Sequence, residues 1–204
     1  MMRLDRGTIL SRVHSSAYSA TSFNPNQADV LYGGGRFDST WDDSYAFTYA
    51  ARSDDAAVAE TLLRDMNADD RGDRFLPKIY WRGRQLSRVR LTDSVDLISL
   101  RSGRDLAAIG QDSWLTSCGA DEYPQTRAWA HWLRRICSAA AGIVWLSKRD
   151  PGSEVLVLFE DRCPSDLLME VPGPLSGSCA FDDDGGFDWL RATLARYRVG
   201  IRRR

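Results

Sequence analysis

Arg36, Tyr49 and Glu60 are the residues of this sequence whose types and spacing point most directly to chemistry. Arg36 follows three glycines, which adopt backbone conformations that other residues avoid, so a ligand can approach this turn closely. An arginine can bind a phosphate or ribose hydroxyls, an aromatic ring can stack on a planar base, and a carboxylate can stabilise a developing positive charge. Because the three side chains are expected on different elements, they can converge on one ligand. This trio indicates chemistry on a dinucleotide.

The elements that must position the trio can be predicted from the local sequence. Residues 46–51 are expected to form a strand that carries Tyr49. A helix is expected after Ser53, which is a good N-cap and is followed by two acids that suit the positive end of a helix. That helix carries Glu60 at the edge of an apolar stripe and is expected to end near the polar run 67–73.

The remaining elements are mixed in type and show no regular strand–helix alternation, which favours an α+β fold. We expect strands over 8–13, 143–147 and 154–159, helices over 124–140 and 187–197, and loops at 15–27, 150–152, 172–177 and 182–184. The helix over 124–140 is expected to present an apolar face, with its cations mostly opposite: Trp129, Trp132, Leu133, Ile136 and Ala140 against Arg127, His131, Arg134 and Arg135.

Each residue of the trio also has an ordinary structural explanation. Arg36 could be an incidental cation on a surface turn, and Tyr49 could be a core aromatic with a satisfied hydroxyl. Glu60 lies one helical turn before Arg64, so a surface ion pair also explains it. The glycine turn matches neither the phosphate-binding P-loop nor the dinucleotide fingerprint G-x-G-x-x-G. The residues alone leave both explanations open.

Composition excludes several classes of protein. Of the 204 residues, 43% are hydrophobic and 27% are charged, which is typical of a folded globular protein and argues against disorder. A net charge of -1 provides no overall field for nucleic acid or anionic membranes. The sequence has no apolar run long enough to cross a membrane and no apolar signal core. We therefore expect one cytoplasmic domain over residues 1–204.

Several other chemistries have little support in the sequence. A metal site is not expected, because His14 and His131 have no cysteine at ligand spacing. Ser147 ends an apolar strand without a G-x-S-x-G elbow, so it fits the hydrogen-bonding wall of a pocket better than a nucleophile. Without a secretion signal, the four cysteines are expected to be reduced and mostly structural: Cys118, Cys137, Cys163 and Cys179.

Residues 71–104 form a basic segment that suggests a different function. Nine Lys or Arg stand against three Asp, so the segment carries 9 − 3 = +6. The alternation over 88–91 predicts a half-exposed strand with its cations facing water. Such a segment is either a solvated face or a surface for an anion, a partner or nucleic acid.

Six segments together resemble the RES domain family, whose name refers to arginine, glutamate and serine. They occur in the family's order: LSRV (10–13), SFNP (22–25), GGRFD (34–38), YAARSDDAAVAETL (49–62), YPQTRAWA (123–130) and WLSKRDPGSEVLVLFEDR (145–162). The resemblance covers about residues 9–162 and is strongest over 34–64 and 123–162. Residues 163–204 are then a C-terminal extension packed on the same domain.

The resemblance implies an ADP-ribosyltransferase-like fold, with a mixed split β-sheet core and flanking helices. It implies an enzyme that cleaves the nicotinamide–ribose bond of NAD+ as its substrate, by hydrolysis, phosphorolysis or ADP-ribose transfer, with no cofactor and no metal. Many members of the family are toxins of two-gene toxin–antitoxin systems. A separate antitoxin protein is therefore implied as a partner, and direct binding to nucleic acid or membrane is not.

The resemblance also implies roles for single residues. The family's catalytic positions fall on Arg36, Tyr49 and Glu60. Its further NAD+-binding positions fall on Arg12 and on Ser147, which would bond the nicotinamide amide. The connection between Arg36 and Tyr49 is longer than in the family, which makes Tyr45 a rival stacking residue. Two alternatives stay open: an RES-like partner subunit that has lost catalysis, and a nucleic-acid-binding module using the basic segment. The acceptor of ADP-ribose and a homo-oligomeric state also stay open.

Overall fold

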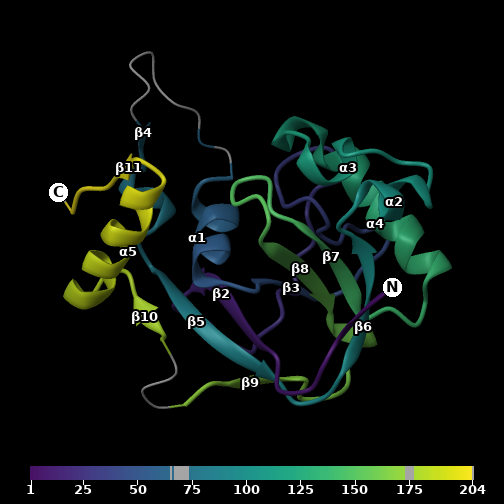
Figure 1. Ribbon diagram of the computed structural model, residues 1–204, viewed down its shortest axis with the longest axis horizontal. Coiled ribbons are helices and arrows are strands. Elements are labelled where there is room, and N and C mark those ends of the chain that lie inside the picture. The colour runs from purple at the N-terminus through teal and green to yellow at the C-terminus, as the bar shows by residue number, and fades with distance from the viewer. Residues whose placement is uncertain (65, 67–73, 173–176, 204) are drawn as a thin grey trace.

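A mixed β-sheet of nine strands is the frame of the computed structural model, which describes residues 1–64, 66, 74–172 and 177–203 (Figure 1). The strand order is β1-β6-β7-β8-β3-β2-β5-β10, and β9 also pairs with β5. Within this sheet β6 and β7 are parallel and the other described pairs are antiparallel. The strands are β1 (Met2–Leu4), β2 (Ile9–Ser15), β3 (Phe47–Ala51), β5 (Arg84–Leu91), β6 (Val95–Leu100), β7 (Gly142–Leu146), β8 (Glu154–Phe159), β9 (Leu168–Glu170) and β10 (Cys179–Ala180). A small parallel sheet joins β4 (Arg74–Phe75) to β11 (Val199–Gly200).

Five α-helices flank the sheet in the described residues (Figure 1). They are α1 (Asp54–Leu62), α2 (Gly103–Ala107), α3 (Trp114–Ser117), α4 (Tyr123–Ile136) and α5 (Asp184–Arg196). Apolar side chains of all five join the larger of two hydrophobic cores, which lies on one face of the sheet. A smaller core on the other face includes Leu10, Val89 and Leu156 and is closed by Ala20 and Leu167. The predicted α+β architecture with flanking helices is confirmed.

The sheet is split between β2 and β3. β2 pairs with β5 at seven positions and β3 pairs with β8 at five, but β2 and β3 pair with each other only at Ser11 and Ala51. Farther along, the backbone of Asn24 takes the place of β2 and exchanges two hydrogen bonds with Phe47, of 2.7 and 3.0 Å. Between these two pairings the strands separate, so side chains of both strands border an opening. The predicted split sheet is confirmed.

Helix α1 begins where the sequence predicts and is fastened to the sheet at its first turn. The N-cap Ser53 accepts a hydrogen bond from the Ala56 amide at 3.1 Å through its hydroxyl. Asp54 accepts hydrogen bonds from Ser11 of β2 (2.5 Å) and Arg88 of β5 (2.6 Å). Burial opposes the effect, but these two bonds lower the pKa of Asp54 below its usual value. The helix ends at Leu62, earlier than expected, and the predicted boundary at 67–73 lies outside the described residues.

Helix α4 presents a different face to the core from the one that the sequence predicts. Its buried stripe is Tyr123, Thr126, Arg127, Ala130, Leu133 and Arg134. Ile136 is exposed, and Trp129 and Trp132 are only partly buried. The prediction is right for Leu133, Ala140 and Arg135. It is wrong for Ile136 and for Arg127 and Arg134, because these two arginines meet acceptors that lie far away in the sequence. Arg127 donates to the carbonyl of Gly33 at 2.8 Å, and Arg134 binds Asp43 and Asp161, both at 2.9 Å.

The other predicted elements agree with the structure within a few residues. The strand 154–159 has the predicted bounds, and the strand predicted over 143–147 ends one residue before Ser147. Val89 is buried in β5 while Arg88 and Arg90 are half-exposed, as the alternation predicts. The C-terminal segment packs on the same core through residues that include Phe181, Leu190 and Ile201. The loop predicted over 172–177 lies mostly outside the described residues, and all four cysteines are free.

Candidate functional site

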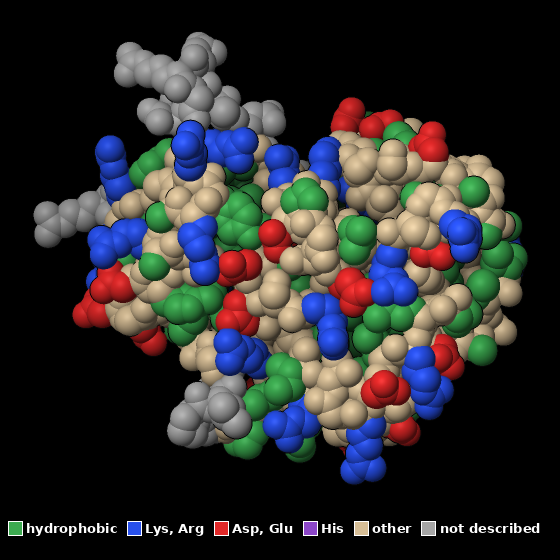
Figure 2. Space-filling view, viewed as in Figure 1, with side chains coloured by type: hydrophobic (Ala, Val, Ile, Leu, Met, Phe, Trp, Pro, Cys, Tyr) green, Lys and Arg blue, Asp and Glu red, His purple; other side chains and the backbone are tan. Residues whose placement is uncertain are grey.

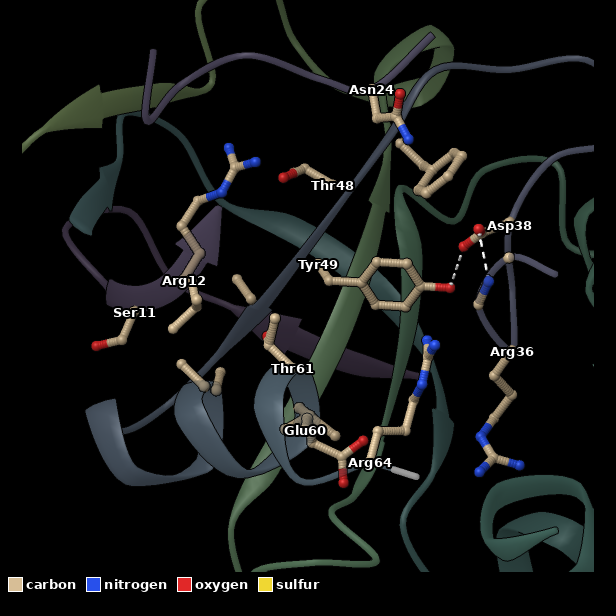
Figure 3. A pocket seen from close by; sticks show the side chains of 18 of the residues that line it. Ser11, Arg12, Asn24, Arg36, Asp38, Thr48, Tyr49, Glu60, Thr61 and Arg64 are labelled. Carbon is tan, nitrogen blue, oxygen red and sulfur yellow. Dashed lines mark hydrogen bonds between the residues drawn. The ribbon is translucent and has the colours of Figure 1, made fainter. Parts of the chain in front are cut away.

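The split between β2 and β3 opens into a cleft of about 460 Å³ (Figure 3). Most of its lining comes from β2, β3, α1, the glycine turn 34–38 and the start of β5. Figure 3 shows Arg12 and Thr48 at one end, Arg36 and Asp38 at the other, and Tyr49 between them. The residues that line the cleft are Ser11, Arg12, Val13, Asn24, Gly34, Gly35, Arg36, Asp38, Phe47, Thr48, Tyr49, Ala50, Ala51, Ala57, Glu60, Thr61, Arg64, Arg84, Tyr123, Trp145 and Val155.

Tyr49 lies on the cleft, whereas its rival Tyr45 lies in the core. The Tyr49 hydroxyl donates to Asp38 at 2.7 Å and accepts from the Phe37 amide at 2.9 Å, so its ring is held by its far end. Burial and the neighbouring Asp38 carboxylate raise the pKa of Tyr49 well above its usual value. Tyr45 is 4% exposed, donates to the Phe37 carbonyl and does not line the cleft. Of the two, Tyr49 has the ring that a ligand can reach.

Arg36 lines the cleft, and its guanidinium is held by α3 with its C-cap Cys118 and by Tyr123 of α4. Its Nη1 donates to Leu115 O (3.2 Å) and Cys118 Sγ (2.8 Å), and its Nη2 donates to Cys118 O (3.2 Å). Its guanidinium carbon lies 4.9 Å from the centre of the Tyr123 ring. A guanidinium has five donors, and its contacts with the described residues use three of them, so two remain for a ligand. Arg36 is 6% exposed, which excludes an incidental cation on a solvated surface turn.

Glu60 and Ser147 are brought together although they lie far apart in the sequence. The Ser147 hydroxyl donates to Glu60 Oε1 at 2.6 Å, and the Lys148 amide donates to the same oxygen at 3.1 Å. Ser147 also accepts from the amides of Arg149 (3.1 Å) and Asp150 (2.9 Å), which fixes the direction of its hydroxyl. Glu60 lines the cleft and Ser147 is buried behind it. The contact of Ser147 with the nicotinamide amide stays a prediction.

Cations outnumber carboxylates in the cleft. Four arginines, Arg12, Arg36, Arg64 and Arg84, line it together with two carboxylates, Asp38 and Glu60. Burial lowers the pKa of Arg12 to about 10, and its Nη1 donates to the carbonyls of Ala20 (2.5 Å) and Ser22 (2.9 Å). Burial and then the nearby charge of Arg64 lower the pKa of Arg84. Cations that converge in this way suit an anionic ligand such as a diphosphate.

A second cavity of about 280 Å³ adjoins the cleft and shares part of its lining. Arg36, Glu60, Arg64 and Tyr123 belong to both cavities. The second cavity adds two further cations, Lys148 and Arg149, along with Cys118, Gly119, Ala120 and Asp121. The Arg149 guanidinium donates twice to the Arg64 carbonyl, at 3.0 and 2.6 Å. Glu60 therefore lies where two cavities meet.

Several residues of the cleft were not predicted from the sequence. The sequence indicates Arg64 only as a possible ion-pair partner of Glu60, and Arg84 only as one of the cations of the basic segment. Thr61 carries no local signal, because its place in the cleft depends on contacts made after folding. A weak signal existed for Asp38, which follows Arg36 within the resembling segment 34–38. In the described part of the chain, no group of three or more His, Cys, Asp and Glu could hold a metal ion.

Three cations of the basic segment are engaged within the fold, because two are paired with carboxylates and one lines the cleft. Arg88 is paired with Asp54 at 2.6 Å and Arg101 with Glu154 at 2.5 Å. Arg84 turns into the cleft. On the face seen in Figure 2, Lys and Arg side chains are interspersed with Asp and Glu side chains. Arg71 lies outside the described residues. No described helix has the length and apolar character that crossing a bilayer requires.

Comparison with known proteins adds a family and a fold. The sequence model of the RES domain matches residues 9–189, a range that extends past Arg162 into the C-terminal segment. No curated protein shows significant sequence similarity. A chain in the crystal structure of the M. tuberculosis MbcT–MbcA toxin–antitoxin complex has a TM-score of 0.62 and 16% identity, covering 93% of this chain and 92% of that chain. At this identity the likeness establishes a shared fold.

Proposed function

Since the chain belongs to the RES domain family, we propose that it cleaves the nicotinamide–ribose bond of NAD+ and is the toxin of a toxin–antitoxin pair. One observation carries the proposal. Tyr49, Glu60, Arg12 and Arg36 come from four separate segments and line one cleft in which cations outnumber carboxylates. A ring, a carboxylate and several guanidinium groups are the complement of a base, a ribosyl cation and a diphosphate.

The reaction follows from the chemistry of the bond. When the bond between nicotinamide and ribose breaks, its electron pair goes to the ring nitrogen and positive charge develops on the ribose, as in glycoside cleavage. Glu60 is the carboxylate available to stabilise that charge, and the two donors from Ser147 and Lys148 hold it in place. Tyr49 stacks on the nicotinamide ring, while Arg12 and Arg36 bind the phosphates or ribose. Water, phosphate or a protein side chain then accepts the ADP-ribose.

Purified protein is expected to release nicotinamide from NAD+ without added metal and with undiminished rate after treatment with a chelator. The reason is that the proposed transition state is stabilised by a carboxylate and cations of the protein itself. The measurement is nicotinamide release by chromatography, with and without chelator. Activity that disappears on chelation and returns with zinc would contradict the proposal, and no release under any condition would favour the inactive partner subunit.

Expression of the protein alone is expected to lower cellular NAD+ and stop growth. This follows from the proposed reaction, because an unrestrained NAD+-cleaving enzyme in the cytoplasm consumes a pool that its host needs. The similar fold in the MbcT–MbcA toxin–antitoxin complex supports a separate protein as the restraint. The measurement is NAD+ content and growth after induction, with Glu60→Gln as the matched control. Unchanged growth and NAD+ with active, soluble protein would contradict the toxin assignment.

A further inference from the structure

Asp38 is the buried carboxylate of the cleft to which the family resemblance assigns no role. It is 9% exposed and lies at the end of the glycine turn that carries Arg36. Its Oδ2 accepts from the Gly35 amide at 2.6 Å, and its Oδ1 accepts from the Tyr49 hydroxyl at 2.7 Å. Both bonds are drawn in Figure 3, where Asp38 lies between the Tyr49 ring and the turn. One carboxylate therefore joins the turn to β3.

The turn is packed so closely around Asp38 that a side chain at Gly34 or Gly35 would clash with its neighbours. A Cβ atom on Gly35 would lie 2.6 Å from Asp38 Oδ1 and 2.9 Å from the Tyr49 hydroxyl. Gly34 has a φ of +74°, and its Cβ would lie 2.6 Å from the side chain of Ala28. On the other side, Arg127 donates to the Gly33 carbonyl at 2.8 Å. Gly35 thus leaves the space in which the carboxylate bonds to Tyr49, and Gly34 allows the positive φ of the turn.

We infer that Asp38 is a positioning residue that sets the Tyr49 ring and the Arg36 turn relative to each other across the cleft. Tyr49 and Arg36 come from different elements, and Asp38 is bonded to both of those elements at once. The second bond to the tyrosine oxygen, from the Phe37 amide at 2.9 Å, closes the same ring of contacts. This inference rests on the proposed NAD+ cleavage. Asp38 acts through Tyr49 and the turn, without contact with the reacting atoms.

The groups that surround Asp38 shift the pKa of its carboxyl in opposite directions. Tyr49 faces it from β3, Arg64 from the end of α1 and Arg127 from α4. Burial raises the pKa of Asp38, while the bonds from Gly35 and Tyr49 and the two arginines oppose this effect. An ionised carboxylate accepts from both donors, whereas the protonated form has one oxygen that must donate. The substitution Asp38→Asn copies that neutral form with almost the same shape, so it is the informative variant.

The test compares Asp38→Asn with Asp105→Asn, a matched control outside the cleft. Asp105 also accepts from a hydroxyl, Ser99 at 2.7 Å, and from an amide, Arg101 at 3.1 Å. Asp38→Asn is expected to lower kcat/KM for nicotinamide release roughly tenfold or more, because it removes a charge-assisted hydrogen bond. In the wild type, protonation of Asp38 should lower kcat/KM as the pH falls. This loss should be missing from the pH profile of Asp38→Asn. Asp105→Asn is expected to keep kcat/KM within about twofold and to keep that limb.

A second measurement does not depend on activity. Amide hydrogen exchange at Gly35 and Phe37 should be faster in Asp38→Asn than in the wild type or Asp105→Asn. The reason is that the Gly35 amide donates to Asp38 and the Phe37 amide donates to the Tyr49 hydroxyl that Asp38 holds. Faster exchange with unchanged kinetics would overturn the positioning role and leave a structural one. Lower activity with unchanged exchange would mean that Asp38 acts on the substrate directly, which also overturns the inference. Absence of nicotinamide release in the wild type would instead overturn the proposed function. Amide hydrogen exchange would still decide whether Asp38 holds the turn to Tyr49.

Discussion

Glu60→Gln is expected to lower kcat for nicotinamide release by about a hundredfold to a thousandfold and to change KM for NAD+ little. Glutamine keeps the size of the side chain and an oxygen that can accept from Ser147 and the Lys148 amide, at 2.6 and 3.1 Å in the wild type. What it removes is the negative charge that faces the developing ribosyl cation. The loss therefore falls on the transition state more than on the bound substrate.

Two further variants separate the position of Glu60 from the binding of the substrate. Ser147→Ala removes one of the two donors to Glu60 and should lower kcat less than Glu60→Gln does, because the Lys148 amide remains. Arg36→Ala should weaken NAD+ binding as well as the rate, since the groups that it binds are charged before and during the reaction. All three variants are measured by nicotinamide release and by melting temperature. Near-normal turnover of a folded Glu60→Gln protein would mean that Glu60 is not the carboxylate that stabilises the ribosyl cation.

Arg134→Met is expected to lower the free energy of unfolding by about 2 kcal/mol, because it removes the hydrogen bonds of a buried guanidinium to Asp43 and Asp161, whose own side chains are 31% and 49% exposed and stay hydrated. The Arg134 side chain is 3% exposed and binds Asp43 and Asp161, both at 2.9 Å. Its guanidinium also lies 3.8 Å from the centre of the Tyr45 ring and 4.5 Å from that of Phe159. Methionine keeps much of the apolar length of the side chain, so the loss reports the charge and its hydrogen bonds.

The neighbouring residue provides the control for this stability prediction. Arg135 is exposed on the same helix, and Arg135→Met should change the free energy of unfolding by less than about 0.5 kcal/mol. Denaturant unfolding of both variants measures the difference. KM for NAD+ should stay unchanged in Arg134→Met, because Arg134 does not line the cleft. Equal stability of the two variants would show that Arg134 and its two carboxylates contribute no more to the free energy of unfolding than the exposed Arg135 does.

The local parts of the fold could be predicted from the sequence because their causes are local. Ser53 caps the helix that carries Glu60, and the strand over 154–159 follows from a run of apolar residues. Arg36, Tyr49, Glu60 and Arg12 were expected to share one site, and they line one cleft. Their catalytic roles stay predictions that the variants above test.

The rest depends on contacts between residues far apart in the chain. An arginine among tryptophans on a predicted helix looks exposed, yet Arg127 and Arg134 are buried by carbonyls and carboxylates contributed by other segments. The importance of Asp38 arises in the same way, since its partner Tyr49 lies on another element. Strand order could not be predicted either, because β3 pairs with β8, which lies far later in the chain.

The split in the sheet also has a consequence for how the domain unfolds. β2 with β5 forms one continuous ladder and β3 with β8 another, but Ser11 and Ala51 are the single register position that links the two ladders directly. This link and the two hydrogen bonds between Asn24 and Phe47 leave few backbone bonds to break between the ladders, so we expect the ladders to open as separate cooperative units. A dinucleotide that fills the split would contact both ladders at once. Substrate would then stabilise the native state by joining two halves that the backbone leaves almost separate.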